Sequence, residues 1–178
     1  MVETSRNLEQ QGFQIKQATT SDEISHIRDL FTAYTTWLDI DLAFQNYASE
    51  VASLPGLYVP PPGALLLATL GTSCTSLPTN SPIGCIALRQ LKSSSISKIC
   101  EVKRLYTVPE ARGLGLGRAL IGKVLEIARE LGYEEIVLDT LEDKMEDAVK
   151  LYKKMGFEEI SAYYETPLAG TLFLGRKL

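Results

Sequence analysis

The spacing of hydrophobic and polar positions changes along the chain, and these changes predict its secondary structure. Residues 13–17 alternate as in a β-strand, and apolar residues at helical spacing follow a capping box over residues 20–23. A second helical pattern starts after Asp41 and stops at residues 55–63, which are rich in proline and glycine. We therefore expect two helices before the main sheet.

The later patterns alternate strands with helices. A strongly amphipathic segment follows a glycine-rich turn and ends at Gly132, and another helix is expected over residues 147–155. The Ser/Thr/Pro-rich residues 71–82 predict an exposed mobile loop, and residues 93–97 predict a turn. Strands are expected at residues 64–70, 83–91, 99–108, 135–139, 157–162 and 170–177. The resulting order is β-α-α-β-β-β-α-β-α-β-β, without an internal repeat or a linker.

Length and composition indicate one globular domain. A chain of 178 residues with 45% hydrophobic and 22% charged residues can bury a substantial core. We assign residues 1–12 to a flexible N-terminus and residues 13–178 to the domain. No apolar run approaches the ~20 residues of a membrane span, and the first residues resemble no signal or transit peptide. The expectation is a soluble cytoplasmic protein without a membrane partner, either a monomer or a homodimer.

Cysteine and histidine are too few and too scattered for common metal or nucleophile chemistry. Cys74, Cys85 and Cys100 match neither a disulfide framework nor a C-x-x-C site, and His26 is the single histidine. No G-x-S-x-G elbow accompanies it. These observations predict reduced, buried thiols and no metal.

The charge is acidic overall but locally positive. The net charge of −4 argues against nonspecific nucleic-acid binding, which usually requires a basic face. Residues 98–129 nevertheless carry seven cations against three carboxylates, which gives this window a charge of +4. A local anion site is therefore expected inside an acidic protein.

The most informative segment is Arg-Gly-Leu-Gly-Leu-Gly, residues 112–117, between an expected strand and an expected helix. Its glycines permit a close approach of the backbone, and the N–H groups of the first helical turn attract anions. A pyrophosphate cradle is favoured over a ligand-free turn, whose glycines would cost conformational entropy. Asp139 at a strand end supports a Rossmann fingerprint, but its spacing would require glycine at Arg118. A P-loop would require a G-K-[ST] ending, which is missing.

Two motifs together resemble the Gcn5-related N-acetyltransferase (GNAT) superfamily. Its signature [Q/R]-x-x-G-x-[G/A] is matched by Arg112, Gly115 and Gly117. The stretch Ala-Val-Lys-Leu-Tyr-Lys-Lys-Met-Gly-Phe, residues 148–157, is similar to a family motif near the C-terminus, and the likeness covers about residues 13–177. The resemblance implies an α/β (α+β) fold with a mixed central sheet of about seven strands, four helices and a splayed strand pair at the coenzyme A site.

The resemblance also implies an enzyme, an N-acetyltransferase that uses acetyl-CoA as co-substrate and no metal. The acceptor would be a primary amine of a small molecule or a peptide. A non-catalytic acyl-CoA-binding sensor of the same fold is the alternative, and it would tolerate loss of the catalytic residues. A nucleotide-binding oxidoreductase is the third, more distant interpretation.

By the same resemblance, coenzyme A would lie along one strand and the glycine-rich turn. Backbone groups of the splayed strand would reach the pantetheine arm at Leu105, Tyr106 and Thr107. Met145 stands where many members carry an asparagine that bonds the pantetheine, seven residues before Tyr152. The pyrophosphate would be held by Arg112, Gly113, Leu114, Gly115, Leu116, Gly117 and Arg118.

Two side chains are candidates for proton transfer. Glu101 lies in the register where histone-acetylating members carry a catalytic glutamate, and would act as general base directly or through water. The alternative is an exposed strand glutamate paired with Lys103 or Arg104. Tyr152 would protonate the departing thiolate as general acid, or else pack in the core beside Phe157.

The resemblance places the acceptor between the first two helices and the last strand pair. Aromatic and acidic residues occur together in these segments, which suits a small cation or an amino-acid-like amine. The alternative is an ordinary helix junction and β-turn with exposed acids. The candidate acceptor residues are Tyr34, Trp37, Asp39 and Tyr164.

Overall fold

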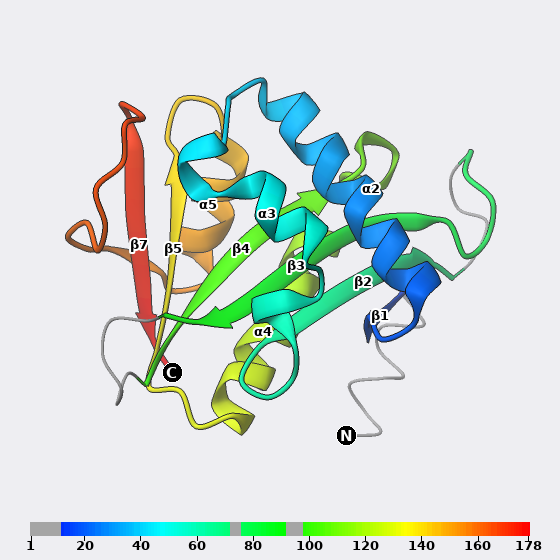
Figure 1. Cartoon of the computed structure of the whole chain (residues 1–178), viewed down its shortest axis with the longest axis horizontal. Helices are drawn as coiled ribbons and strands as arrows, with labels where there is room; N and C mark the ends of the chain where they lie inside the picture. Colours follow the sequence, from blue (N-terminus) through cyan, green and yellow to red (C-terminus); the bar gives the residue numbers. More distant parts are fainter. Residues whose placement is uncertain (1–11, 72–75, 92–97) are drawn as a thin grey trace.

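The computed structural model describes residues 12–71, 76–91 and 98–178, and its elements follow the predicted order (Figure 1). The predicted α/β class, with seven strands and four α-helices in these ranges, is confirmed. The helices are α2 (Ser21–Leu38), α3 (Tyr47–Ala52), α4 (Leu116–Glu130) and α5 (Glu146–Lys154), with the 3-10 turns η1 (Ala43–Gln45), η2 (Gly56–Tyr58) and η3 (Pro109–Ala111). The strands are β1 (Phe13–Gln17), β2 (Ala64–Leu70), β3 (Pro82–Gln90), β4 (Ile99–Thr107), β5 (Glu135–Leu141), β6 (Glu158–Glu159) and β7 (Thr171–Lys177).

Two predicted elements differ from the observed ones. The second predicted helix is divided into η1 and α3 by Asn46, whose φ of 57° lies in the left-handed region and breaks the helical path. The strand predicted over residues 157–162 is only the two-residue β6 at the sheet edge. Residues 1–11 of the predicted flexible N-terminus, the turn at residues 93–97 and part of the loop at residues 71–82 lie outside the described residues.

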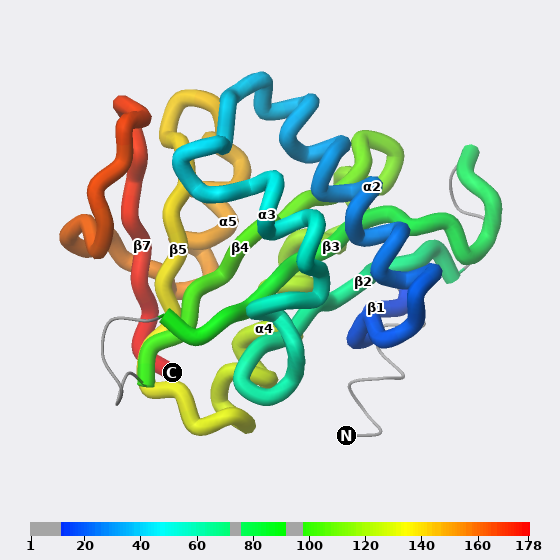
Figure 2. The backbone as a smooth tube through the Cα atoms, viewed as in Figure 1, coloured from blue at the N-terminus to red at the C-terminus, as the bar shows by residue number. Residues whose placement is uncertain are grey.

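One mixed sheet contains the seven strands in the order β1-β2-β3-β4-β5-β7-β6. Neighbouring strands run antiparallel except β4 and β5, which are parallel. This pair is bonded only near its start, from Ile99 opposite Glu135 to Glu101 opposite Val137. Beyond these residues the two strands diverge (Figure 2). The predicted splayed strand pair is therefore present, and it opens the sheet from within.

Helices cover both faces of the sheet. The α2 and α3 helices lie over one face, and α4 and α5 lie over the other (Figures 1 and 2). The β2 strand reads Ala-Leu-Leu-Leu-Ala-Thr-Leu because both of its faces are buried. Leu65 and Leu67 pack with Phe31 of α2, whereas Leu66 and Ala68 belong to the core formed with α4 and α5. These two cores fix the sheet around the divergence of β4 and β5.

The predicted capping box fixes the start of α2. Thr20 Oγ1 accepts a hydrogen bond from the Glu23 backbone N–H at 3.3 Å, and Glu23 Oε2 accepts one from the Thr20 N–H at 3.0 Å. Lys16 adds an ion pair with Glu23 at 2.6 Å. The hydrogen bond from Lys16 and those from the backbone lower the pKa of Glu23 to about 2. The far end of this helix reaches the site described below.

Cys85 and Cys100 are buried free thiols, as predicted, whereas Cys74 lies outside the described residues. Burial raises the pKa of Cys100 to about 12. In the part of the chain that the structure describes, no group of three or more His, Cys, Asp or Glu side chains is placed to hold a metal ion. Of the helices within the same part, none has the length and apolar character needed to cross a membrane.

Candidate functional site

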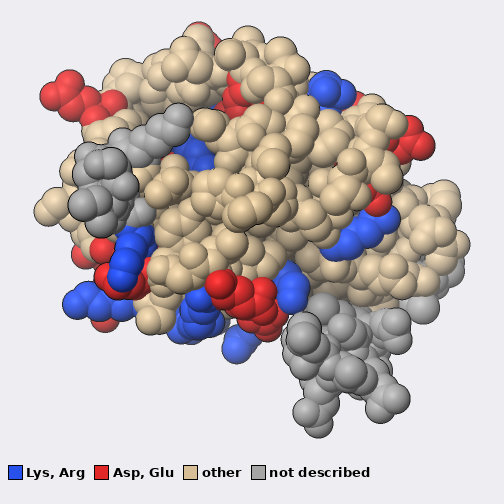
Figure 3. Space-filling model, turned by 60° about the horizontal axis from the view of Figure 1, so that its bottom comes forward, with Lys and Arg blue, Asp and Glu red and all other residues tan. Residues whose placement is uncertain are grey.

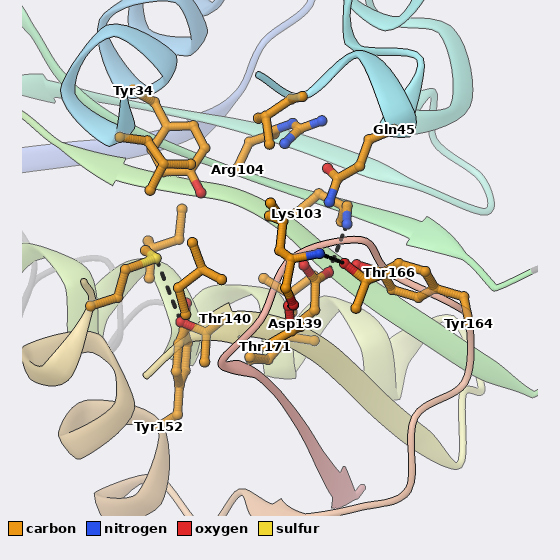
Figure 4. Close-up of a pocket in the computed structure, with 18 residues that line it drawn as sticks. Tyr34, Gln45, Lys103, Arg104, Asp139, Thr140, Tyr152, Tyr164, Thr166 and Thr171 are labelled. Atoms are coloured by element: carbon orange, nitrogen blue, oxygen red, sulfur yellow. Dashed lines mark hydrogen bonds and ion pairs between the residues drawn. The ribbon is translucent and has the colours of Figure 1, made fainter. Parts of the chain in front are cut away.

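Two cavities meet where β4 and β5 diverge. The large cavity, of about 750 Å³, lies between the end of β4, the turn before α4 and the start of α5. The small cavity, of about 50 Å³, lies between β4, β5, the end of α2 and the segment before β7 (Figure 4). Leu105 and Met145 line both cavities and mark their junction.

The glycine-rich turn presents its backbone to the large cavity. Gly113 and Gly115 have φ angles of 81° and 77°, in the left-handed region that favours glycine. A Cβ atom at either position would meet no other atom within 4 Å, so both positions face open space. The first turn of α4 also lines the cavity, while Leu116 is buried in the core. This arrangement suits an anion at a helix N-terminus, and the turn is called the cradle below.

Most cations of the positive window either form ion pairs with carboxylates or line the large cavity. On the face shown in Figure 3, basic and acidic side chains are interspersed rather than gathered into one basic surface. Arg112 and Arg118 line the large cavity, so positive charge is retained beside the cradle. The cations of this window that form ion pairs with carboxylates are Lys98, Lys103, Arg104 and Lys123.

Trp37, a candidate acceptor residue, lies beside this cradle. Its ring centre is 5.6 Å from the Arg112 guanidinium, a cation–π contact. The side chain is 43% exposed and lines the large cavity, not the small one. The structure therefore places Trp37 with the predicted cofactor residues.

The predicted pantetheine residues also line the large cavity. These are Leu105, Tyr106 and Thr107, at the end of β4. Met145 faces them across the junction, and the Thr140 hydroxyl donates to its Sδ at 3.5 Å. A thioether therefore stands where an asparagine would present an amide.

Tyr152 combines a core position with a place in the small cavity. Its side chain is buried, and its ring centre lies 5.7 Å from that of Phe157. It also lines the small cavity, near Thr140 in Figure 4. Burial raises the pKa of Tyr152, so its hydroxyl stays protonated at neutral pH. Packing and proton transfer, the two interpretations from the sequence, are thus compatible in space.

Glu101 is buried next to the cavities but lines neither of them. It is 1% exposed and lies opposite Val137 in the paired part of β4. Its carboxylate accepts hydrogen bonds from Arg89 Nε at 2.7 Å and from the Tyr163 hydroxyl at 3.0 Å, and Lys103 Nζ lies 3.4 Å away. The alternative interpretation of the sequence is an exposed glutamate paired with Lys103 or Arg104. The structure shows the pairing with Lys103, but the Glu101 side chain is buried. Its role as general base stays a prediction, and these contacts add a structural role.

Lys103 extends this network to Asp139, which the sequence pattern connects only with a ribose site. Lys103 Nζ donates to Asp139 Oδ1 at 2.8 Å, and Asp139 lines the small cavity. Burial raises the pKa of Asp139, but the charge and hydrogen bond of Lys103 outweigh it and keep this pKa below its ordinary value. An anionic carboxylate therefore faces the small cavity. In the sequence, Asp139 is recognisable as an acidic residue within an apolar strand, but this pattern does not indicate that Lys103 is its partner.

Side chains from α2, from η1 and from the segment before β7 complete the small cavity (Figure 4). Tyr34 and Tyr164, two candidate acceptor residues, both line it, and burial raises the pKa of Tyr34 to about 12. Gln45, which no sequence pattern indicated, also lines it, and its buried Oε1 has no hydrogen-bond partner within the described ranges. A buried acceptor in this state suits a donor group of a ligand.

Asp39, the remaining candidate acceptor residue, lines neither cavity. It ends α2 with a φ of 51°, and its N–H donates to the Thr35 carbonyl oxygen at 3.0 Å. Aspartate tolerates this left-handed conformation better than most residues do. The structure therefore brings Asp39 to the surface as a helix cap, next to the site rather than in it.

Three features of the site are typical of an N-acyltransferase. The sheet is opened by a diverging parallel strand pair, a glycine-rich turn precedes a helix, and two cavities meet at the opening. The model of the Acetyltransferase (GNAT) family matches residues 26–157. The chain belongs to this family, so the predicted superfamily and the predicted class of enzyme, an acyltransferase, are confirmed.

Relatives and solved structures agree with this assignment. A Schizosaccharomyces pombe protein described as an uncharacterized N-acetyltransferase is 34% identical over 154 residues, which cover 85% of this chain and 86% of that protein. A Dictyostelium discoideum protein of the same description is 28% identical over 222 residues, covering 92% of this chain and 99% of that one. An acetyltransferase structure from Streptococcus agalactiae has a TM-score of 0.71 at 24% identity, covering 94% of this chain and 99% of that chain. The structural likeness shows the fold.

Proposed function

We propose that the protein is an acetyl-CoA-dependent N-acetyltransferase that moves an acetyl group directly to a primary amine of a small molecule or peptide. The observation that carries this proposal is the meeting of the two cavities at Leu105 and Met145. Direct transfer requires both reactants to be bound at once. A long cofactor in the large cavity and a compact amine in the small one would meet at this junction.

The large cavity suits coenzyme A through its backbone. Gly113 and Gly115 leave open space where a Cβ would stand, so a pyrophosphate would reach the N–H groups of the turn and of α4. The guanidinium groups of Arg112 and Arg118 would add charge at the same end. The proposed contacts are Leu105, Tyr106, Thr107, Arg112, Gly113, Leu114, Gly115, Leu116, Gly117 and Arg118.

Tyr152 would supply the proton that the sulfur gains. Acetyl-CoA, when bound, supplies an acyl thioester whose C–S bond breaks as a C–N bond to the amine forms. A buried phenol is a weak acid, but the same burial raises the proton affinity of a thiolate, as it does for Cys100. Proton transfer from Tyr152 is therefore closer to balanced in the cavity than in water.

The amine has to lose its own proton. With an ordinary pKa near 10.4, about one lysine-like amine in two thousand is uncharged at pH 7, which corresponds to about 4–5 kcal/mol. Asp139 would attract the ammonium into the small cavity beside Tyr34 and Tyr164. Glu101 would accept the proton through Tyr163 or water, because it does not line the cavity itself.

Turnover of a panel of primary amines with acetyl-CoA, followed by thiol release, tests the proposal. We expect at least one amine to be acetylated and coenzyme A to raise the melting temperature. Stabilisation by coenzyme A without turnover of any amine would favour a non-catalytic acyl-CoA sensor. Stabilisation by NADH but not by coenzyme A would overturn both interpretations.

A further inference from the structure

The β4 strand carries a bulge at the junction of the two cavities. Two steps along β3 correspond to three steps along β4, from Lys103 to Tyr106. The bulged pair is therefore Arg104 and Leu105. Because Leu105 lines both cavities, the bulge lies where the reactants of the proposed transfer would meet.

Arg104 adopts a conformation that glycine would adopt more easily. Its φ of 57° lies in the left-handed region, which costs free energy for a residue with a Cβ atom. Its side chain is also only 4% exposed, so a charged guanidinium is withdrawn from water. Two unfavourable features thus coincide at one residue of the junction.

The side chain of Arg104 is bound as a fork to Glu50 of α3. Arg104 Nε donates to Glu50 Oε1 at 3.0 Å, and Nη2 donates to Oε2 at 2.6 Å. Glu50 Oε1 also accepts from the Tyr58 hydroxyl at 2.6 Å, and the Tyr47 ring lies 5.2 Å from the guanidinium. Burial raises the pKa of Glu50, but Arg104 outweighs burial and keeps it low, so the pair stays charged. The bulge is thereby tied to the helix that covers it.

We propose that the ion pair of Arg104 and Glu50 is a positioning device that holds the β4 bulge, so that the backbone at Arg104 and Leu105 meets the acyl carbonyl at the cavity junction. This inference rests on the proposed function. Backbone N–H groups aimed at a developing oxyanion accelerate acyl transfer only while their direction is fixed. A bidentate fork fixes direction at one strained residue more strictly than apolar packing does.

Fold stability alone is a poor reason for this pair. Buried ion pairs are often matched or exceeded in stability by apolar side chains of the same volume, because desolvation offsets the attraction. Glycine at position 104 would remove the backbone cost as well. Strain, burial and a charged fork at one residue are therefore explained better by the backbone geometry that they impose on the bulge than by a gain in stability.

Three variants separate positioning from stability. Arg104→Ala and Arg104→Gly both remove the fork, but only glycine relieves the left-handed φ. Glu50→Gln keeps the shape of the carboxylate and removes its charge. Glu23→Gln breaks the ion pair with Lys16 at the start of α2 and serves as the stability control. For each protein we would measure kcat, acetyl-CoA affinity by calorimetry, and the carbonyl stretch of bound ¹³C-labelled acetyl-CoA.

We expect kcat to fall about 100-fold in Arg104→Ala and about tenfold in Arg104→Gly and in Glu50→Gln, while acetyl-CoA affinity changes less than about threefold. The carbonyl stretch should move toward its value in water in all three, and the control should keep kcat and the stretch. Equal losses in the alanine and glycine variants, or an unmoved stretch, would overturn the proposal. Absence of turnover in the unmodified protein would refute the proposed function instead, and the stretch would still report on the bulge.

Discussion

The large and small cavities share a junction but are built in different ways. Between the end of β4 and the start of α5, the large cavity is bounded by the contiguous glycine-rich turn, in which Gly113 and Gly115 open the backbone to it. The small cavity is walled by side chains from several separate segments, backed by ion pairs that run from Arg89 through Glu101 and Lys103 to Asp139. The large cavity presents backbone dipoles to its interior, whereas the small cavity is surrounded by buried charge.

This difference decides which substitutions each cavity tolerates. A backbone cradle is indifferent to most side chains but sensitive to any atom that fills its space. A buried ionic network depends on every partner, because removing one leaves an uncompensated charge at a cost of about 3–5 kcal/mol. Changes beside the large cavity should therefore alter coenzyme A affinity, whereas changes beside the small cavity should alter turnover and stability.

The largest effect is expected from Gly115→Val. Valine would place a branched side chain in the open cradle and would have to adopt a φ of 77°. We expect acetyl-CoA affinity, measured by calorimetry, to fall about 100-fold or more, which is about 2.7 kcal/mol. Gly122→Ala is the matched control, because a Cβ there also meets no atom within 4 Å but lies inside α4. The control should keep its affinity and gain about 0.5–1 kcal/mol of stability.

Unchanged affinity in Gly115→Val would mean that the cradle lies elsewhere. Gly117→Val is a less specific test, although the sequence motif suggests both positions equally. A Cβ at Gly117 would lie 3.3 Å from Leu151 Cδ2, so valine there would also disturb the packing of α5. Of these two positions, Gly115 is the one that separates cofactor binding from packing.

The next effect concerns the small cavity, through Tyr152→Phe. The change keeps the ring against Phe157 and removes only the hydroxyl. We expect kcat to fall about 100-fold, a typical contribution of a general acid, with acetyl-CoA affinity and melting temperature nearly unchanged. Steady-state kinetics with the best amine of the panel would measure this. A wild-type rate would leave Tyr152 as a core residue and assign protonation of the thiolate to solvent.

The large cavity was more predictable from the sequence than the small one. The glycine-rich turn is a contiguous motif, and the structure places all of its predicted cofactor residues except Leu114 around the large cavity with Leu105, Tyr106 and Thr107. Leu114 packs against the core instead. Hydrophobic periodicity likewise predicts the element order. Because helices cover both faces of the sheet, the strands are apolar and the covering helices are amphipathic, and both patterns are visible in the sequence. Asn46 divides the second helix through a local left-handed conformation that periodicity does not encode.

The small cavity depends on contacts that no short segment of sequence contains. Asp139 meets Lys103 because parallel β4 and β5 bring these positions side by side just past their last bonded pair, and Gln45 joins them from a 3-10 turn. The burial of Glu101 has the same origin, since alternation along a strand cannot distinguish a solvated acid from one enclosed by Arg89 and Tyr163. The residues of the small cavity are therefore brought together mainly by the tertiary arrangement, which a local sequence pattern does not show.

A smaller effect on turnover is expected from Glu101→Gln. If Glu101 is the base through Tyr163 or water, kcat should fall about tenfold at pH 7, and the loss should shrink toward pH 9 as free amine becomes available. The loss of charge beside Arg89 and Lys103 should also lower the free energy of unfolding by about 3 kcal/mol. A pH–rate profile and thermal unfolding distinguish the two effects. A kcat defect that does not vary with pH would leave Glu101 with its structural role alone.

The smallest effect is expected from Trp37→Leu, at the rim of the large cavity. The cation–π contact with Arg112 holds the guanidinium beside the cradle, and such contacts contribute about 0.5–1 kcal/mol at exposed sites. Acetyl-CoA affinity should therefore weaken about two- to fivefold, and Trp37→Phe, which keeps a ring, should weaken it less. Calorimetry would measure both variants.

Trp37 is the single tryptophan of the chain, so its fluorescence in the unmodified protein should change as coenzyme A draws Arg112 toward the pyrophosphate. The sequence pattern assigns Trp37 to the acceptor instead, and that assignment predicts a raised KM for the amine with unchanged acetyl-CoA affinity. The first assignment changes acetyl-CoA affinity and the second changes the KM for the amine, so the measurements distinguish them. A raised amine KM would mean that the acceptor extends past Leu105 to the rim of the large cavity. The contrast between a cavity lined by backbone and a cavity lined by side chains would then hold only for the part of the large cavity beside Gly113 and Gly115.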